Sequence, residues 1–212
     1  MPTPDAGPVS SPLLLGVLAG LAVAVPVGPV GVLLLRTGVV DGLRVAVGAA
    51  FGVATVDLAY AVVAVTVGTP VSRALAGHAG LVRGVGAVVL VVVGGVGLVA
   101  SLRAARLPPS DLPAGGGWSP LGAYARFVGL TAVNPTTAVT FTTVAIGLAL
   151  GVTGTASVAA FVVGAGAASL AWQLLLAVGS SVVGHRLPPR ARVVASVVGA
   201  GAVVLAGVAM LV

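Results

Sequence analysis

The sequence predicts an all-α integral membrane protein with six transmembrane helices, and its composition and residue pattern carry this prediction. Hydrophobic residues make up 58% of the chain and charged residues only 7%, with a mean hydropathy of +1.22. A soluble domain carries about 25% charged residues, because water covers its surface. This chain has too few charges for that, so lipid must face most of its surface. The apolar residues also fall in long runs that short arginine clusters separate.

Six apolar runs are long enough to cross a bilayer, since about 20 residues span about 30 Å of hydrocarbon. The fourth and fifth runs are joined by residues 151–154, which carry no charge. Fusing these two runs would require one helix far longer than a bilayer is thick, so six is the better count. The expected spans are Pro12–Leu35, Leu43–Val67, Gly80–Leu102, Leu121–Leu150, Thr155–Val183 and Arg192–Val212.

The arginines predict the orientation of these spans. Short loops rich in basic residues stay in the cytoplasm. On one side lie Arg73 and Arg83, and on the other Arg36, Arg44, Arg103, Arg106, Arg126, Arg186, Arg190 and Arg192. We therefore expect a multi-pass protein of the inner (plasma) membrane with both termini, including the tail 1–11, outside the cytoplasm. Because the net charge of +6 is divided among such loops, it does not indicate a nucleic-acid partner.

A polar linker at 103–120 divides the chain into two halves, 12–102 and 121–212, each with three expected spans. An odd number of spans per half gives the halves opposite orientations, so we expect two inverted three-helix repeats. The first span of each half is interrupted at a comparable depth, by Pro26-Val27-Gly28-Pro29 and by Asn134-Pro135. Interruptions at corresponding places in two halves are the best sequence pointer to a transport site.

The two interruptions have a defined chemical consequence. Proline removes a backbone donor and forces the helix to kink or open, and lipid cannot satisfy the carbonyls that are freed. They must face protein or a water-filled cavity. A simple packing kink explains Pro26, Gly28 and Pro29 equally well when they are taken alone, but the matching break favours a binding role. Asn134 is the polar group at that second break, and Thr136 follows Pro135.

Asp57 is the only acidic residue expected in the middle of a span. A carboxylate at the bilayer centre costs about 2.5–3.5 kcal/mol on insertion scales, so such residues mark functional sites by default. The apolar surroundings favour its neutral acid, which makes Asp57 a candidate to carry a proton or to pair with a substrate ammonium. The structural alternative is a buried acid that is hydrogen-bonded to a neighbouring helix, with Tyr60 as a candidate partner.

The remaining polar and small residues point to packing as much as to function. Gln173 in the fifth span is equally suited to interhelical hydrogen bonding and to substrate contact. Glycines spaced four apart allow two helices to approach closely, and packing within one subunit is their simplest role. A homodimer remains open. These pairs are Gly16/Gly20, Gly48/Gly52 and Gly147/Gly151.

Enzymatic and metal chemistry have little support in the sequence. The chain has no cysteine, and no two His, Asp or Glu residues have metal-ligand spacing on one helix. No nucleophile with a base, phosphate loop or zinc site is present. We expect neither a cofactor nor a catalytic activity.

Two stretches of the sequence resemble the LysE-type amino-acid exporters. The first runs from Pro26-Val27-Gly28-Pro29 through Leu35-Arg36-Thr37-Gly38 to Ala54-Thr55-Val56-Asp57, and the second is Asn134-Pro135-Thr136-Thr137. Length, six spans and the central linker also fit, so the resemblance covers essentially the whole chain.

The resemblance implies secondary-active export of amino acids or related small metabolites, by exchange with protons. It assigns the family's glycine-proline break to Gly28 and Pro29, its acidic position to Asp57 and its asparagine-proline break to Asn134 and Pro135. The chain departs from the family where many members have Pro-Gly-Pro at the first break or lysine after Asn-Pro; it contains no lysine. The motifs thus indicate the superfamily and say little about the substrate.

Two other functions compete with amino-acid export. Distant relatives in the superfamily export divalent cations, but such a site needs several converging oxygen or imidazole ligands. A single carboxylate in the middle of a span is a poor match. A non-transporting assembly partner would have its helix breaks packed with apolar side chains instead of opening on a polar cavity.

Overall fold

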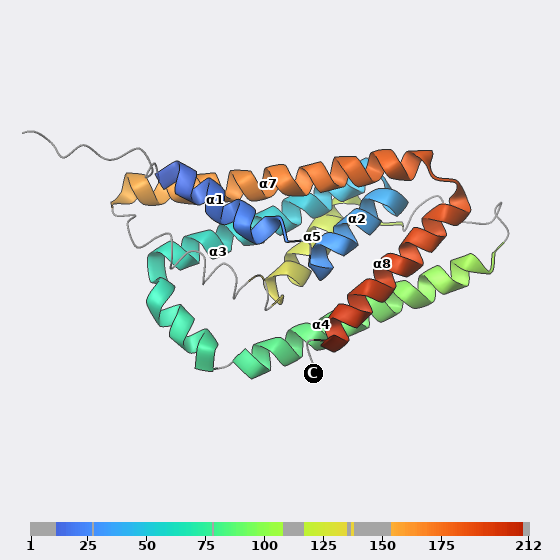
Figure 1. Ribbon diagram of the computed structural model, residues 1–212, viewed down its shortest axis with the longest axis horizontal. Helices are drawn as coiled ribbons and strands as arrows, with labels where there is room; N and C mark the ends of the chain where they lie inside the picture. Colours follow the sequence, from blue (N-terminus) through green and yellow to red (C-terminus); the bar gives the residue numbers. More distant parts are fainter. Residues whose placement is uncertain are drawn as a thin grey trace, which may run out of the picture.

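The computed structural model describes residues 12–26, 28–77, 79–107, 117–134, 137 and 154–209, and most of them are helical (Figure 1). The helices are α1 (Pro12–Ala24), α2 (Pro29–Asp41), α3 (Leu43–Gly77), α4 (Ala79–Ala105), α5 (Pro120–Ala132), α7 (Thr155–Arg186) and α8 (Pro189–Ala209).

The described residues contain three helical stretches that are long and apolar enough to cross a membrane, or four if the bent pair α1 and α2 is one span. The three stretches are Leu43–Thr66, Ala87–Ala105 and Thr155–Arg186. The chain is therefore an all-α membrane protein. Six spans and the inverted repeat stay predictions, because much of the expected fourth span lies outside the described residues.

Several helices extend beyond the spans expected from hydropathy. α3 begins at Leu43 as predicted but continues to Gly77, and α2 continues to Asp41, past the expected end of the first span. Hydropathy reports where the apolar run ends, whereas backbone hydrogen bonds can continue a helix into the interface. α2 stops where Gly42 adopts φ +85°, a positive φ that glycine reaches without the steric cost that a side chain would bring.

α7 is the element around which the site is arranged. α1 packs along α7, and α2 and α3 also contact it, while α5 packs against α3. The main core lies among α2, α3, α5 and α7, where Leu34, Ala49, Phe127 and Ala177 are buried. α4 packs against α8, and α8 contacts α2, so this helix pair lies beside the central group (Figure 1).

Two of the expected glycine pairs pack helices within this chain. A β-carbon at Gly16 or Gly20 on α1 would collide with a backbone carbonyl of α7. Gly48 and Gly52 on α3 approach the backbone of α5 in the same way. Close backbone approach of this kind is how small residues stabilise helix pairs where no hydrophobic force acts between them. The third pair, Gly147 and Gly151, lies outside the described residues.

Replacing Gly20 with alanine should lower the melting temperature of the detergent-purified protein. The added β-carbon would meet the carbonyl oxygen and Cα of Ala165, and such overpacking costs about 1–3 kcal/mol. The matched control is Gly179→Ala on α7, where a β-carbon would meet nothing within 4 Å. That change should leave stability equal or raise it by up to about 1 kcal/mol. Equal melting temperatures for the two variants would contradict the proposed helix contact.

Candidate functional site

The break between α1 and α2 forms one wall of a cavity. α1 ends at Ala24 and α2 begins at Pro29, and the two helices meet at a bend of 79°. Pro26 cannot donate a backbone hydrogen bond, whereas Pro29 takes the first helical position, where no intrahelical bond is lost. Gly28 precedes it in an extended conformation. The prolines thus end one helix and start the next in the middle of the expected first span.

The first turn of α2 presents backbone donors to this cavity. The Val32 N–H donates to the carbonyl of Gly28 at 3.0 Å, but the N–H groups of Val30 and Gly31 have no acceptor within the helix. Gly28 provides no side-chain cap, and Gly28, Val30 and Gly31 all line the cavity. A helix start with uncapped N–H groups carries partial positive charge and favours an anionic group.

The end of α5 forms the opposite wall, and two carbonyls in its last turn accept hydrogen bonds from outside the regular helix pattern. α5 ends at Ala132, and the next residues lead to Asn134 and Pro135. The Asn134 N–H donates to the Thr131 carbonyl at 3.1 Å. The Tyr60 hydroxyl, on α3, donates to the Ala132 carbonyl at 2.8 Å. These bonds allow the helix to end at membrane depth without leaving those carbonyls unsatisfied.

Asp57 comes from the middle of the apolar stretch of α3 and is 2% exposed. The Ser169 hydroxyl of α7 donates to its Oδ2 atom at 2.5 Å. Asp57 is therefore bonded to a neighbouring helix, as the structural alternative required, but its partner is Ser169 and not Tyr60. Because Asp57 also lines the cavity, the bond to Ser169 anchors one oxygen while the carboxyl group borders the open space.

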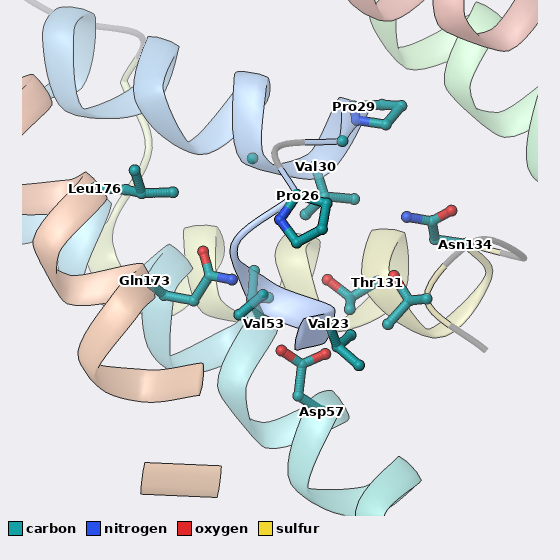
Figure 2. A pocket seen from close by; sticks show the side chains of 14 residues that line it. Val23, Pro26, Pro29, Val30, Val53, Asp57, Thr131, Asn134, Gln173 and Leu176 are labelled. Atoms are coloured by element: carbon teal, nitrogen blue, oxygen red, sulfur yellow. The ribbon is translucent and has the colours of Figure 1, made fainter. Parts of the chain in front are cut away.

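These elements enclose a cavity of about 100 Å³, which has room for a few water molecules or a small polar solute. Figure 2 shows Gln173 and Thr131 on either side of Pro26, with Asp57 nearby. The lining residues come from the α1–α2 break and from α3, α5 and α7: Val23, Ala24, Pro26, Gly28, Pro29, Val30, Gly31, Val53, Asp57, Thr131, Asn134, Thr137, Gln173 and Leu176.

Two polar atoms in this lining are buried without a hydrogen-bond partner. They are Thr131 Oγ1 and Gln173 Oε1. A buried polar group left unpaired costs about 1–3 kcal/mol, and each such group in a folded protein calls for an explanation. Both atoms are closed off from a water-sized probe, so a partner could reach them only if the lining moved.

Most of the predicted site residues meet at this cavity. Two of them, Pro135 and Thr136, lie outside the described residues. The other six come from four separate segments of the chain and line the one cavity: Pro26, Gly28, Pro29, Asp57, Asn134 and Gln173. Their role in binding stays a prediction, but the geometry places them where a single small molecule can touch several of them.

Sequence reasoning missed Ser169, Thr131 and the bond that Tyr60 makes. Ser169 stands four residues before Gln173, on the same face of α7, and this spacing was visible in the sequence. Thr131 is one of many threonines near the second break, and nothing in the sequence distinguishes it. Tyr60 was considered as a partner of Asp57, whereas the structure uses its hydroxyl at the end of α5.

The donor set of the cavity does not fit a divalent cation. Within the described part of the chain, no three His, Cys, Asp or Glu side chains are grouped so that they could hold a metal ion. Ca²⁺ takes 6–8 oxygen ligands and softer metals prefer imidazole or thiolate. The cavity lining provides one carboxyl group.

A cavity that is bordered by two helix breaks and a buried carboxyl group, and enclosed by apolar helices, is typical of a membrane transport protein. The comparison with protein families agrees: the model of the family described as LysE type translocator matches residues 21–212. The chain belongs to the LysE type translocator family, a family of transporters. No match was found among curated proteins or among solved structures.

Removal of the Tyr60 hydroxyl should destabilise the second helix break. In Tyr60→Phe the Ala132 carbonyl loses its donor, at a cost of about 0.5–1.5 kcal/mol for a typical hydrogen bond, and the melting temperature in detergent should fall. Tyr124→Phe is the matched control, because the Tyr124 hydroxyl makes only a long contact, of 3.4 Å, with the Thr55 hydroxyl. A fall of equal size in both variants would show that the Ala132 carbonyl does not depend on Tyr60.

Proposed function

We propose that this protein is a secondary-active exporter of amino acids or related small metabolites across the inner membrane, coupled to protons. One observation carries the proposal: a cavity between two helix breaks is lined by a buried carboxyl group and by the first turn of a helix that has no side-chain cap. Membership of the translocator family supports it.

An amino acid has two charged groups, and the cavity has a suitable partner for each. The ammonium group pairs with the Asp57 carboxylate. The carboxylate faces the N–H groups of Val30 and Gly31 at the start of α2, where the helix dipole favours negative charge. Transporters with broken helices commonly use helix starts in this way.

Proton coupling follows from the use of one carboxyl group by two competing partners. Asp57 cannot pair with an ammonium while it holds a proton, because the neutral acid has no charge to offer. Substrate release toward one side of the membrane therefore allows protonation from that side. This competition gives exchange of substrate for protons without a second ionisable residue.

Alternating access would use the two three-helix halves, 12–102 and 121–212, as inverted repeats with six spans in total. The breaks at Pro26–Pro29 and Asn134–Pro135 then occupy corresponding positions, and the cavity lies where the halves meet. Rocking of one half against the other would open the cavity to each side in turn. The apolar surface of the helices faces membrane lipid.

The assembly-partner alternative has less support than transport. It requires helix breaks packed by apolar side chains, whereas this cavity contains Asp57 and the unpaired atoms of Thr131 and Gln173. A divalent-cation exporter would need more oxygen or imidazole ligands than the cavity lining provides. Neither alternative accounts for the uncapped start of α2.

Substitution of Asp57 should abolish export. Cells expressing the protein are preloaded with labelled amino acids, and efflux is followed for the wild type and for Asp57→Asn, Ser169→Ala and Ser169→Thr. Asp57→Asn should lose acceleration of efflux for every substrate. Ser169→Ala should slow it about tenfold by freeing the carboxyl group that must be held in place, and Ser169→Thr, which keeps the hydroxyl, should restore most of the rate.

Ser181→Ala is the control for this experiment. Ser181 is also buried on α7, but its hydroxyl donates to the Ala177 carbonyl of its own helix, away from the cavity. Its efflux should match the wild type. Unaltered efflux in Asp57→Asn would remove Asp57 from the mechanism, and no acceleration by the wild type across the panel would contradict amino-acid export.

The orientation is tested with single cysteines in this cysteine-free chain. Leu43→Cys places a thiol at the first residue of α3, and Gly80→Cys places one in the first turn of α4, on the opposite side of the membrane in the predicted topology. If the arginine-rich loops are cytoplasmic, an impermeant maleimide should label position 80 in intact cells and position 43 only after permeabilisation. The reverse pattern would invert the proposed topology.

A further inference from the structure

The outer face of α4 carries a groove that shares no described lining residue with the cavity between the helix breaks. The groove has a volume of about 380 Å³, and its described lining consists of Gly95, Val96, Val99, Ala100 and Arg103. Residues spaced three and four apart lie on one face of a helix, so these residues form a continuous strip. Val96 is 67% exposed and Val99 is 48% exposed, so the strip is open to the surroundings of the helix.

The groove is apolar along its length and cationic at one end. Gly95 leaves space at the apolar end, since a β-carbon there would meet nothing within 4 Å. Arg103 stands at the other end, and the helix rises about 12 Å between these two residues. Both belong to Ala87–Ala105, a stretch that is long and apolar enough to cross a membrane. A ligand that matches the groove therefore needs an apolar part of this length and an anionic group at its end.

More arginines are found at the same end of the helix pair α4 and α8. The two helices run antiparallel: Gly94 faces Val204, and further along α4 the Ser101 hydroxyl is 2.6 Å from the Ser196 hydroxyl. The end of α4 and the start of α8 thus lie at one end of the pair (Figure 1). The arginines in or beside these two helix ends are Arg103, Arg106, Arg190 and Arg192. The first three are exposed, so their guanidinium groups are accessible to a ligand.

Acidic residues do not neutralise this arginine cluster. Among the described acidic residues, Asp57 borders the cavity, and Asp41 interacts electrostatically with Arg36 and Arg126. The described lining of the groove contains no carboxyl group. Asp111 follows α4 in the sequence, but one carboxylate cannot balance four guanidinium groups. The end of the groove therefore carries an excess of positive charge.

We infer that this groove binds an anionic phospholipid, with an acyl chain along Gly95–Ala100 and the phosphate on the arginine cluster. Basic pockets between membrane helices bind the headgroups of anionic lipids, and arginine suits phosphate because it donates two parallel hydrogen bonds. A zwitterionic lipid matches less well, since its own ammonium group offsets the charge of its phosphate. The inference does not depend on the proposed transport function.

A second copy of the chain is a poorer occupant of the groove. Two copies inserted in the same orientation and paired symmetrically through this face would present the same residues to each other at the same depth. Their arginine clusters would then meet, and like charges close to an apolar medium repel strongly. An anionic headgroup removes this repulsion, so charge complementarity favours the lipid.

Native mass spectrometry of the delipidated full-length protein in a neutral detergent tests the inference. The protein is titrated with phosphatidylglycerol or with phosphatidylcholine that carries the same acyl chains. The wild type should bind the first phosphatidylglycerol at least about tenfold more tightly, because several arginines each favour an anionic lipid. Arg103→Gln should weaken phosphatidylglycerol binding about fivefold and should change phosphatidylcholine binding much less.

Gly95→Leu tests the apolar part of the groove. A β-carbon at this position meets no other part of the protein, so the leucine side chain occupies the groove and displaces the acyl chain. Both lipids should bind at least about fivefold more weakly. Gly84→Leu is the matched control, because Gly84 lies on the same helix with equally open space but outside the described lining. Arg44→Gln, which removes an exposed arginine at the start of α3, controls for net charge, and both controls should bind lipid as the wild type does.

Each outcome decides for or against the lipid site. Equal affinities of the wild type for the two lipids overturn the inference, as do equal phosphatidylglycerol affinities of Arg103→Gln and Arg44→Gln or unchanged binding in Gly95→Leu. A dimer mass that disappears in Gly95→Leu would show that a second copy fills the groove, and this would also overturn it. If Gly95→Leu does not fold, the wild-type ratio and the two arginine variants decide.

Discussion

Every backbone N–H and C=O group at membrane depth needs a partner from the protein or from enclosed water, and this constraint organises the whole site. A continuous helix meets it automatically, but this chain breaks a helix at Pro26–Pro29 and ends another before Pro135. At the second break, Tyr60 donates to the Ala132 carbonyl. At the first break, the N–H groups of Val30 and Gly31 have no acceptor in their helix, and both residues line the cavity. The backbone groups proposed to bind the substrate thus result from interrupted backbone hydrogen bonding.

α7 fixes the geometry of the remaining polar groups. Its close contact with α1 depends on Gly16 and Gly20, where no side chain could fit. Ser169 and Gln173 lie one turn apart on this helix, so both face the interior. One holds Asp57 through a hydrogen bond, and the other borders the cavity. The glycines of α1 set how closely α1 approaches α7. That distance in turn sets where the polar side chains of α7 lie relative to the cavity.

The membrane class and the breaks were readable from the sequence because each follows from composition or from proline. Asp57 was predictable for the same reason, since a single acidic residue in an apolar run has few structural roles. Ser169 and Thr131 were not, because hydroxyl residues are frequent in this chain and only the packing of α5 and α7 shows which of them meet the cavity. Helix ends were also predicted imprecisely: hydropathy marks the apolar run, whereas Gly42 determines where α2 stops.

α2 links the cavity to α4 and α8, two helices whose described residues contribute nothing to the cavity lining. Its first turn lines the cavity, and near its other end the Arg36 Nε donates to the Ser196 hydroxyl of α8 at 2.7 Å. Ser196 in turn is 2.6 Å from the Ser101 hydroxyl of α4. Because α8 contacts α2 and α4 packs against α8, this chain of polar contacts joins the helix pair to the broken helix. The first turn of α2 borders the cavity and Arg36 of the same helix contacts α8, so a tilt of α2 at the cavity would also move its contact with α8 and, through Ser196, with α4.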